Sequence, residues 1–402
     1  MPALKRYQTF FLMLLAGIVV LGFVFNTTVN PFRVTPMPWS SKKLDRYRDI
    51  ENDWNRTSKA GLVRSGTWDA AMFGSSRVDI GLDPNHHVFN GLHCVNLGLN
   101  AGLLVENHAM FRYYMQKQNP RLVVLAIDAG DLTSPLPDKK KKKVADFALS
   151  PLDPKANPLE RELRYHAGIS TLAASFTTVG RAIRGEVADH TPQGFRRDAE
   201  FPENQRKLIS SLYLSTTYRL AQARIAHDGL SEGKMEMLRE IVAECRKADA
   251  RLVIFYTPNH VLFQLAFREL GDVDCYFERD RRALADLAAE ANAANPSAAP
   301  IEVWDFLDGH PLNAPPLPAA GDTTSHLPNW LDLFHATPEI GKEMLDRIDG
   351  GGTYGERLTP EGIPARIAKV RADLEAYAAR YPEDLDFLRQ SLSKFQSPPL
   401  EK

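Results

Sequence analysis

The chain has 402 residues, enough for one large domain or two ordinary ones, and 44% of them are apolar while 25% carry a charge. That balance is typical of a globular protein with a sizeable core, and it excludes collagen, coiled coils, polytopic membrane proteins and mostly disordered chains. The 49 Lys and Arg residues nearly balance the 50 Asp and Glu residues, so the net charge of −1 gives no electrostatic reason to expect a nucleic-acid partner.

Near the N-terminus, residues 10–25 read FFLMLLAGIVVLGFVF, without a charge or a proline. As a helix, the wider stretch 8–28 spans about 30 Å, the thickness of a bilayer's hydrocarbon core. Lys5 and Arg6 precede it and favour a cytoplasmic N-terminus, and no small-x-small cleavage site follows it. We therefore expect residues 1–29 to form a single-pass anchor in the inner membrane, with the remainder periplasmic or otherwise extracytoplasmic. The alternative is a soluble cytoplasmic protein that buries this helix in its core.

Beyond the anchor, residues 30–66 are polar and proline-rich, which predicts a tether. Residues 67–355 then alternate short apolar runs with longer amphipathic stretches. Strands separated by helices predict an α/β fold of three layers, in which a parallel sheet has helices on both faces and binds ligands beyond the carboxyl ends of its strands. The expected strands are 70–73, 93–97, 122–127, 251–256 and 301–304.

Two regions do not follow this alternation. Residues 133–205 are polar with weak periodicity, which indicates an insertion or lid. It contains five consecutive lysines, 139–143, which we interpret as a solvated loop, with attraction to anionic headgroups or glycans as the alternative. Residues 356–402 have helical spacing and are expected to form a C-terminal helical tail.

Two segments far apart in sequence carry the residue types of nucleophilic catalysis. A strand ends at Gly74, Ser75 and Ser76, and Asp332 precedes His335 by one turn of chain. A serine hydroxyl needs an imidazole to take its proton, and the imidazole needs a carboxylate to fix its tautomer. At the end of the first strand, the hydroxyl lies where a strand end and a helix N-terminus offer N–H donors to an oxyanion. Ser76, His335 and Asp332 are therefore the candidate triad.

These segments resemble those of the SGNH (GDSL-like) hydrolase superfamily. Gly74-Ser75-Ser76 is similar to the family's first block, with Ser76 as the nucleophile and Ser75 in the position where aspartate is common. Asp332-x-x-His335 is similar to the last block, which completes the triad. The resemblance spans about residues 68–349 and implies a flavodoxin-like three-layer sheet.

The resemblance also implies where the oxyanion is held. Residues 96–102 are similar to the family's second block, so the N–H of Ala101 or Gly102 is implied as a donor. The third block departs, because Gly130 stands where the family has an asparagine that contacts the oxyanion. Loss of such a donor costs roughly two to three powers of ten in rate unless another group, such as Asn100, substitutes.

A narrower branch combines an anchor with Gly-Ser-Ser-Arg at 74–77 and strand ends like those at 254–258 and 303–306. It contains extracytoplasmic proteins similar to the D-alanyl transfer protein of teichoic acid modification and to exopolysaccharide acetylation factors. The resemblance implies a serine esterase or O-acyltransferase acting on a cell-envelope glycan or its acyl donor, with a membrane-bound O-acyltransferase as a further partner. The alternative is a catalytically inactive scaffold that binds glycan or such an acyltransferase.

Arg77, next to the candidate nucleophile, has two interpretations that the sequence leaves open. It is either a structural cation, paired with a helix or with Asp128 or Asp131, or an anchor for an anionic group of the substrate. His260 follows another strand end, and we favour a structural role for it over a place in the pocket.

Cofactor and metal sites are not expected. The chain has no P-loop and no Gly-x-Gly-x-x-Gly after a strand, so a nucleotide cofactor is not predicted. The spacing of its histidines, among them His86 and His87, is not that of a metal site. The 3 cysteines are too few for a disulfide scaffold, although Cys245 and Cys275 remain open to pairing in an oxidising compartment.

Overall fold

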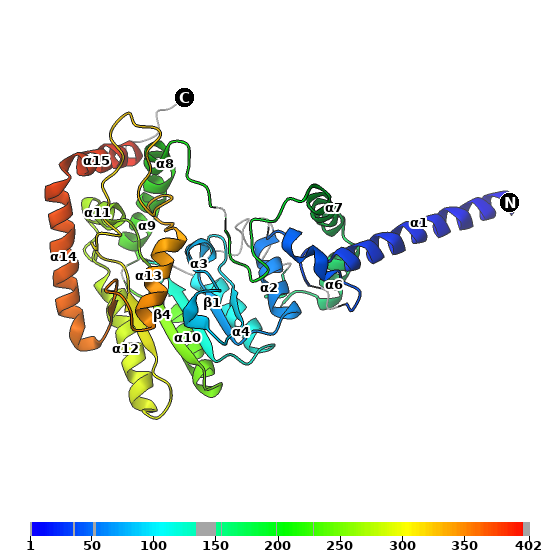
Figure 1. Ribbon diagram of the computed structural model, residues 1–402, viewed down its shortest axis with the longest axis horizontal. Helices are drawn as coiled ribbons and strands as arrows, with labels where there is room; N and C mark the ends of the chain where they lie inside the picture. The colour runs from blue at the N-terminus through cyan, green and yellow to red at the C-terminus, as the bar shows by residue number, and fades with distance from the viewer. Residues whose placement is uncertain are drawn as a thin grey trace. The chain divides into compact units, whose positions relative to one another are not determined.

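The computed structural model describes residues 2–34, 37–50, 54–133, 150–153, 155–197, 199–227 and 229–396. The chain falls into two compact units (Figure 1). The first comprises residues 1–67, 112–118 and 139–197, and the second comprises residues 68–111, 119–138 and 198–402.

The second unit is built on one sheet. Its described strands are β1 (Ala70–Phe73), β2 (Cys94–Asn96), β3 (Leu122–Ile127), β4 (Arg251–Tyr256), β5 (Glu302–Asp305) and β6 (Glu356–Arg357). They follow the order β2-β1-β3-β4-β5-β6; β1 to β5 are parallel and β6 is antiparallel to β5. Every residue of β1, β2, β3 and β5 is buried, as expected of apolar runs in a parallel sheet.

The expected five strands are confirmed, but the sheet is mixed rather than wholly parallel. β6 was not predicted, since two charged residues carry no apolar pattern that could mark them as a strand. They pair with Trp304 and Asp305 of β5, and the Leu358 N–H then donates to the Val303 carbonyl at 2.8 Å. The strand exists because β5 offers an edge, not because of its own composition.

Helices connect and cover the strands of this unit. They are α3 (Ser76–Gly81), η3 (His87–Phe89), α4 (Leu104–Met115), α8 (Gln205–Leu208), η4 (Ile209–Tyr213), α9 (Leu214–Ala226), α10 (Glu232–Lys247), α11 (Val261–Glu269), α12 (Glu278–Ala294) and α13 (Pro338–Ile348). α10 contacts β4, α12 contacts β5, and α13 contacts α3. One side of α10 is buried: Met235, Leu238, Ile241 and Val242.

Residues 356–402 were expected to form a helical tail; Glu356–Arg357 instead form β6, and helices begin at Pro360. These helices are η5 (Pro360–Gly362), α14 (Ile363–Arg380) and α15 (Pro382–Gln396), and they belong to the same compact unit as the sheet. α14 contacts α11, α12 and α15.

A buried charge cluster ties two of these helices to the end of β5. Arg281 of α12 and Arg366 of α14 both donate from Nε to Asp305 Oδ2, at 2.8 and 2.7 Å. Arg366 Nη1 also reaches Asp308 Oδ2 at 2.9 Å. Burial alone would raise the pKa of Asp305, but the two guanidinium groups lower it overall.

The cysteines are buried and unpaired. The pairing of Cys245 with Cys275 that the sequence left open therefore does not occur. Burial raises the pKa of these thiols and of Cys94, which keeps them protonated and unreactive.

The first unit begins with α1 (Pro2–Val29), which lies within the predicted anchor, residues 1–29, and contains its apolar stretch 8–28. Its segment Leu4–Val29 is long and apolar enough to cross a membrane, and an 18-residue stretch within it has a mean hydropathy of 2.3 and no buried residue. Among the described residues it is the one helix with these properties. A buried core helix, the alternative interpretation of this segment, does not fit that exposure.

Residues 30–66, expected as a tether, instead contain the buried helix α2 (Asn55–Ser65). A Cβ on Gly61 would lie 1.9 Å from the Phe32 carbonyl oxygen, so α2 packs directly on the chain that leaves α1. The fully buried Lys59 donates to a backbone carbonyl at 2.6 Å. The expectation of a tether is therefore wrong, because the polar groups of this stretch are used in hydrogen bonds inside the unit.

The expected insertion, residues 133–205, contributes most of its described part to this first unit. The five lysines 139–143 lie outside the described residues. The remaining described helices of the unit are η1 (Lys42–Tyr47), α6 (Pro158–Ala167) and α7 (Ile169–Arg184).

We expect Arg366→Ala to lower the free energy of unfolding by about 3–5 kcal/mol, because it leaves the buried Asp308 without its cation and Asp305 with Arg281 alone. Lys369→Ala is the matched control on the same helix: its exposed pair with Asp373 should be worth less than about 0.5 kcal/mol. Urea unfolding of the detergent-solubilised chain, followed by tryptophan fluorescence, measures both. Equal effects of the two substitutions would contradict the importance of the cluster.

Candidate active site

Ser76 begins α3 directly beyond the end of β1. The turn requires Gly74, because a Cβ there would lie 2.4 Å from Val78 Cγ2. Ser75 caps the helix by accepting the Arg77 N–H on its Oγ at 3.3 Å. The Ser76 N–H is one of the unpaired donors of a helix N-terminus, and no described residue accepts it. The carboxyl end of β1 thus presents both a hydroxyl and an N–H from one residue.

His335 and Asp332 lie in the loop that leads into α13. Ser76 Oγ is 2.8 Å from His335 Nε2, and His335 Nδ1 is 2.7 Å from Asp332 Oδ2. The other carboxylate oxygen, Oδ1, accepts the backbone N–H groups of Phe334 and His335 at 2.6 and 3.0 Å. The three candidate triad residues, with Ser76 and His335 259 positions apart, therefore form one hydrogen-bonded chain.

The protonation states follow from these contacts. Because an ionised carboxylate only accepts, His335 carries its ring proton on Nδ1 and presents the Nε2 lone pair to the Ser76 hydroxyl. Burial by itself would raise the pKa of Asp332, but the nearby His335, the Tyr213 phenol and backbone N–H groups lower it overall. Asp332 is therefore ionised at neutral pH and can orient and stabilise an imidazolium.

Tyr213 is a member of the site that sequence reasoning missed. It ends the π-helical turn η4, and its ring centroid lies 5.2 Å from that of Phe334 and 6.1 Å from that of His335. Burial, followed by the charge of Asp332 and a hydrogen bond to it, raises the pKa of the phenol. Tyr213 therefore stays protonated and supports the carboxylate. No motif in the sequence marks this residue; the π-helical turn that carries it, a feature common at functional sites, becomes visible in the structure.

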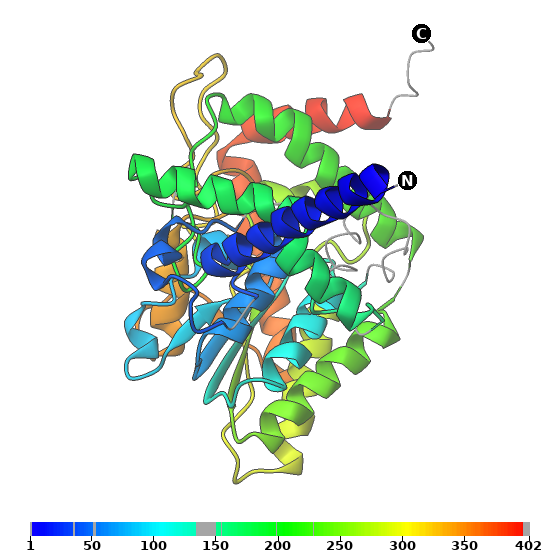
Figure 2. The same cartoon turned by 90° about the vertical axis from the view of Figure 1, so that its right-hand side faces the viewer.

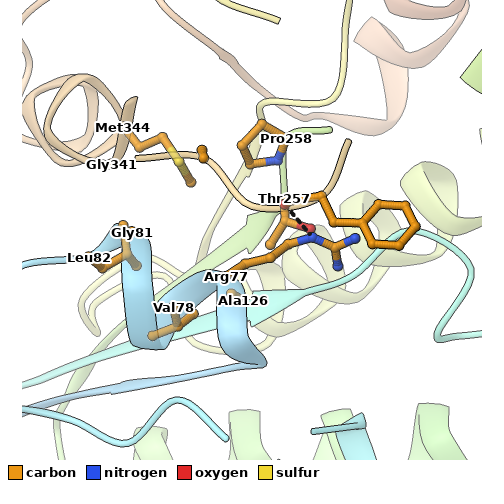
Figure 3. A pocket seen from close by; sticks show the side chains of 11 residues that line it. Arg77, Val78, Gly81, Leu82, Ala126, Thr257, Pro258, Gly341 and Met344 are labelled. Atoms are coloured by element: carbon orange, nitrogen blue, oxygen red, sulfur yellow. Dashed lines mark hydrogen bonds between the residues drawn. The ribbon is translucent and has the colours of Figure 1, made fainter. Parts of the chain in front are cut away.

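Arg77 links the nucleophile's helix to the His335 loop and to two strand ends. Its Nε donates to the Phe334 carbonyl at 3.0 Å, the contact drawn as a dashed line in Figure 3. Its Nη2 donates to Asn259 Oδ1 at 2.8 Å, and Nη1 lies 2.5 Å from Asp128 Oδ2. All three arms of the guanidinium are engaged, which favours the structural interpretation over an anion anchor.

A small pocket adjoins Arg77 (Figure 3). Thr257 and Pro258 at the end of β4 and Met344 of α13 contribute to its mostly apolar lining. Neither Ser76 nor His335 lines it. We therefore assign this space to packing between α3 and α13 and not to a substrate.

The turn after β2 contains Ala101 and Gly102, the two residues whose N–H groups the resemblance implies as oxyanion donors. The Leu99 N–H donates to the Gly74 carbonyl at 2.8 Å, which places this turn beside the start of α3. The Gly102 N–H is used on the Leu99 carbonyl at 2.9 Å, so this candidate does not fit the role. Ala101 has a left-handed backbone (φ 48°), and no described residue accepts its N–H. Of these two candidates, Ala101 is thus the one whose N–H has no described acceptor, and the half-buried Asn100 lies in the same turn.

The third block, residues 128–131, serves structural contacts. Gly130, where the resemblance to SGNH hydrolases implies an asparagine, has a left-handed backbone (φ 84°), and its N–H points to Asp280 Oδ2 at 3.3 Å. Asp131 pairs with the fully buried Lys234 at 2.6 Å. Neither Gly130 nor Asp131 therefore supplies the side-chain donor that the resemblance implies in this segment.

One group of side chains has the composition of a metal site. Donor atoms of His86, His87 and Asp346 all lie within 4.8 Å of one another, which the sequence spacing did not predict. However, His86 Nδ1 accepts the Val88 N–H at 3.2 Å, so the ring proton is on Nε2, where it faces Asp346 at 3.0 Å. A nitrogen that carries a proton has no lone pair for a metal. The contacts therefore describe a histidine–carboxylate pair.

His260 is a buried structural histidine, as we favoured from the sequence. Its Nε2 donates to the Pro315 carbonyl at 2.8 Å, and its Nδ1 accepts the Leu262 N–H at 3.3 Å. Burial lowers its pKa to about 4, so the ring is neutral.

No protein-family model matches this chain, and no curated protein matches it.

The lowered pKa of Asp332 predicts a pH-dependent contribution to stability. A carboxyl whose pKa is lower in the folded state stabilises the fold above its unfolded pKa of about 4, and this is lost as the pH falls through the folded pKa. Asp332→Asn should therefore lower the unfolding temperature most at pH 7, with the gap to the parent shrinking below about pH 4. Thermal unfolding of both proteins between pH 3 and 7 measures this. A gap that stays constant or widens on acidification would contradict it.

Proposed function

We propose that the chain is a membrane-anchored serine acyl-esterase or O-acyltransferase of the SGNH type, acting outside the cytoplasm on a cell-envelope glycan or its acyl carrier. The observation that carries this proposal is the hydrogen-bonded relay from Asp332 through His335 to Ser76. Such a relay makes a serine nucleophilic toward an acyl ester. The glycan and the compartment rest on the resemblance and on the anchor.

In the first half-reaction, Ser76 Oγ attacks the acyl carbonyl while His335 Nε2 accepts its proton. The N–H groups of Ser76 and Ala101 are the donors proposed for the resulting oxyanion. The tetrahedral intermediate then collapses, the bond to the leaving group breaks, and His335 returns its proton to the leaving oxygen or sulfur. The product is an acyl ester on Ser76.

In the second half-reaction, a hydroxyl replaces the leaving group. His335 takes a proton from water or from a sugar hydroxyl, whose oxygen attacks the acyl-serine carbonyl. Collapse of this second intermediate releases the acid or the new ester, and His335 returns the proton to Ser76 Oγ. Water gives an esterase and a sugar gives a transferase; exclusion of water from the site separates the two.

The sheet supports the SGNH-type fold in this proposal. The order β2-β1-β3-β4-β5 is that of flavodoxin-like sheets. Right-handed crossovers put α3 on one face and α4, α10 and α12 on the other, and the contact of α13 with α3 adds α13 to the first layer. Ligands bind where the strand order reverses, between β1 and β3. Ser76 follows β1 directly.

The apolar helix α1 supports the location. We propose that it crosses the inner membrane with its N-terminus in the cytoplasm, on the strength of Lys5 and Arg6. A membrane-bound O-acyltransferase in the same bilayer is then the proposed partner, since it would supply the acyl group.

Gly130 favours a second candidate function, a scaffold that binds glycan or an acyltransferase without catalysis. This residue lacks the side-chain donor of the family's asparagine, and its N–H points to Asp280. A protein of this kind would keep the triad's geometry but not react.

Ser76→Ala should abolish labelling by a fluorophosphonate probe and lower hydrolysis of a chromogenic acetyl ester by roughly three or more powers of ten. Ser75→Ala is the matched control: it removes a helix cap worth about 1 kcal/mol but should keep most of the labelling. Labelling of Ser76→Ala at the parent's rate would refute the assignment of Ser76 as the nucleophile. A folded parent that is never labelled would favour the scaffold.

Arg77→Met should lower kcat by about ten- to a hundredfold with little change in KM, because the His335 loop loses its support. The loss should be equal for a neutral acetyl ester and an anionic succinyl ester. Arg282→Met, on the exposed side of α12, is the control. A rise in KM confined to the anionic ester would instead make Arg77 a substrate anchor.

A further inference from the structure

Helix α7 of the first unit has its polarity inverted. Ile169, Phe176 and Ile183 follow one another at intervals of seven residues along one stripe, and they are 86%, 62% and 81% exposed. A helix of a soluble domain shows the opposite arrangement, with its apolar stripe inward. The buried residues of α7 are Thr171, Ser175 and Thr178.

The inward hydroxyls of α7 are paired. Thr171 and Thr178 donate to backbone carbonyls of α6 and α7, at 2.9 Å each. Ser175 donates to Asn26 Oδ1 of α1 at 3.0 Å. Because the polar face is satisfied inside the unit, the apolar face is held outward by specific hydrogen bonds.

The outward stripe is continuous with the apolar surface of α1. α6 and α7 both contact α1, and both views show them beside its C-terminal part (Figures 1 and 2). The rings of Phe25 and Phe176 lie 5.0 Å apart. Asn26, the first polar residue after the apolar run, donates to the His166 carbonyl of α6 at 2.9 Å. α7 is thus level with the last apolar turn of α1.

Helix α6 extends the same kind of surface. Its Leu159 and Leu163, one turn apart, are 69% and 57% exposed. Arg164 of α6 and Arg184 of α7 are also exposed, and each is paired with a glutamate, Glu160 and Glu186. Long amphipathic side chains of this kind beside an apolar stripe can cover acyl chains with their stems at a bilayer surface.

We propose that α6 and α7 lie in the interface of the bilayer that α1 crosses, with Ile169, Phe176 and Ile183 among the acyl chains. We assign lipid as the occupant of the outward face of α7 for two reasons. This face is continuous with the uncovered apolar surface of α1, and it lies level with the point where the sequence of α1 becomes polar. This interface would fix the depth and rotation of the first unit at the membrane. The inference uses the proposed anchor but does not depend on the proposed chemistry.

The test uses the full chain in nanodiscs of phosphatidylethanolamine and phosphatidylglycerol. Nitroxide labels are attached to Phe176→Cys and Ile183→Cys, with Ser170→Cys and Thr177→Cys, exposed on the flank of the same helix, as matched controls. The parent's buried native thiols set the background. Electron paramagnetic resonance then compares collisions with oxygen, which partitions into lipid, and with a water-soluble nickel chelate.

We expect the ratio of oxygen to nickel accessibility to be several-fold higher at 176 and 183 than at 170 and 177. Equal ratios at all four positions, with free access of nickel, would mean a water-exposed face and would overturn the proposal. Labels protected from both oxygen and the nickel chelate would mean that protein covers this face of α7, and this result would also overturn the proposal. If the chain does not co-purify with the nanodiscs, both the proposed membrane anchor and this proposal are wrong, whereas the conclusions from the Ser76 assays are unaffected.

Discussion

The arrangement of the site depends on the contacts of the Arg77 guanidinium. Its three arms reach the carboxyl ends of β3 and β4 and the backbone of the loop that carries His335. Ser76 precedes Arg77 on the same short helix, so one side chain fixes both partners of a 2.8 Å hydrogen bond. The planar fork of arginine suits this task, because it offers several donors in fixed directions at the cost of ordering one side chain.

The features that could be predicted from sequence are those set by short-range patterns. β1 to β5 are apolar runs that end at turns, and α1 is an uninterrupted apolar stretch, so each can be recognised within a few residues. Asp332 and His335 were recognisable for the same reason, since one tight loop contains both. Their meeting with Ser76 followed from a general property of parallel sheets, whose strands direct their carboxyl ends to one edge.

The features that were missed depend on distant partners. α2 is a polar helix that is buried because Gly61 fits under the Phe32 backbone and Lys59 finds a carbonyl, neither of which its composition reveals. β6 exists only as a complement to β5. The choice between Ala101 and Gly102 required backbone conformation, and Tyr213 reaches Asp332 from a helical segment with no recognisable motif.

The unpaired, buried cysteines have a consequence for how the protein matures. Cys94, Cys245 and Cys275 lie in the core of the sheet-bearing unit as small apolar side chains. Its fold therefore needs no thiol oxidase, and an oxidising compartment would add no covalent crosslink between these cysteines. The same unit is equally compatible with a reducing cytosol, so its assembly is independent of the redox state of its compartment.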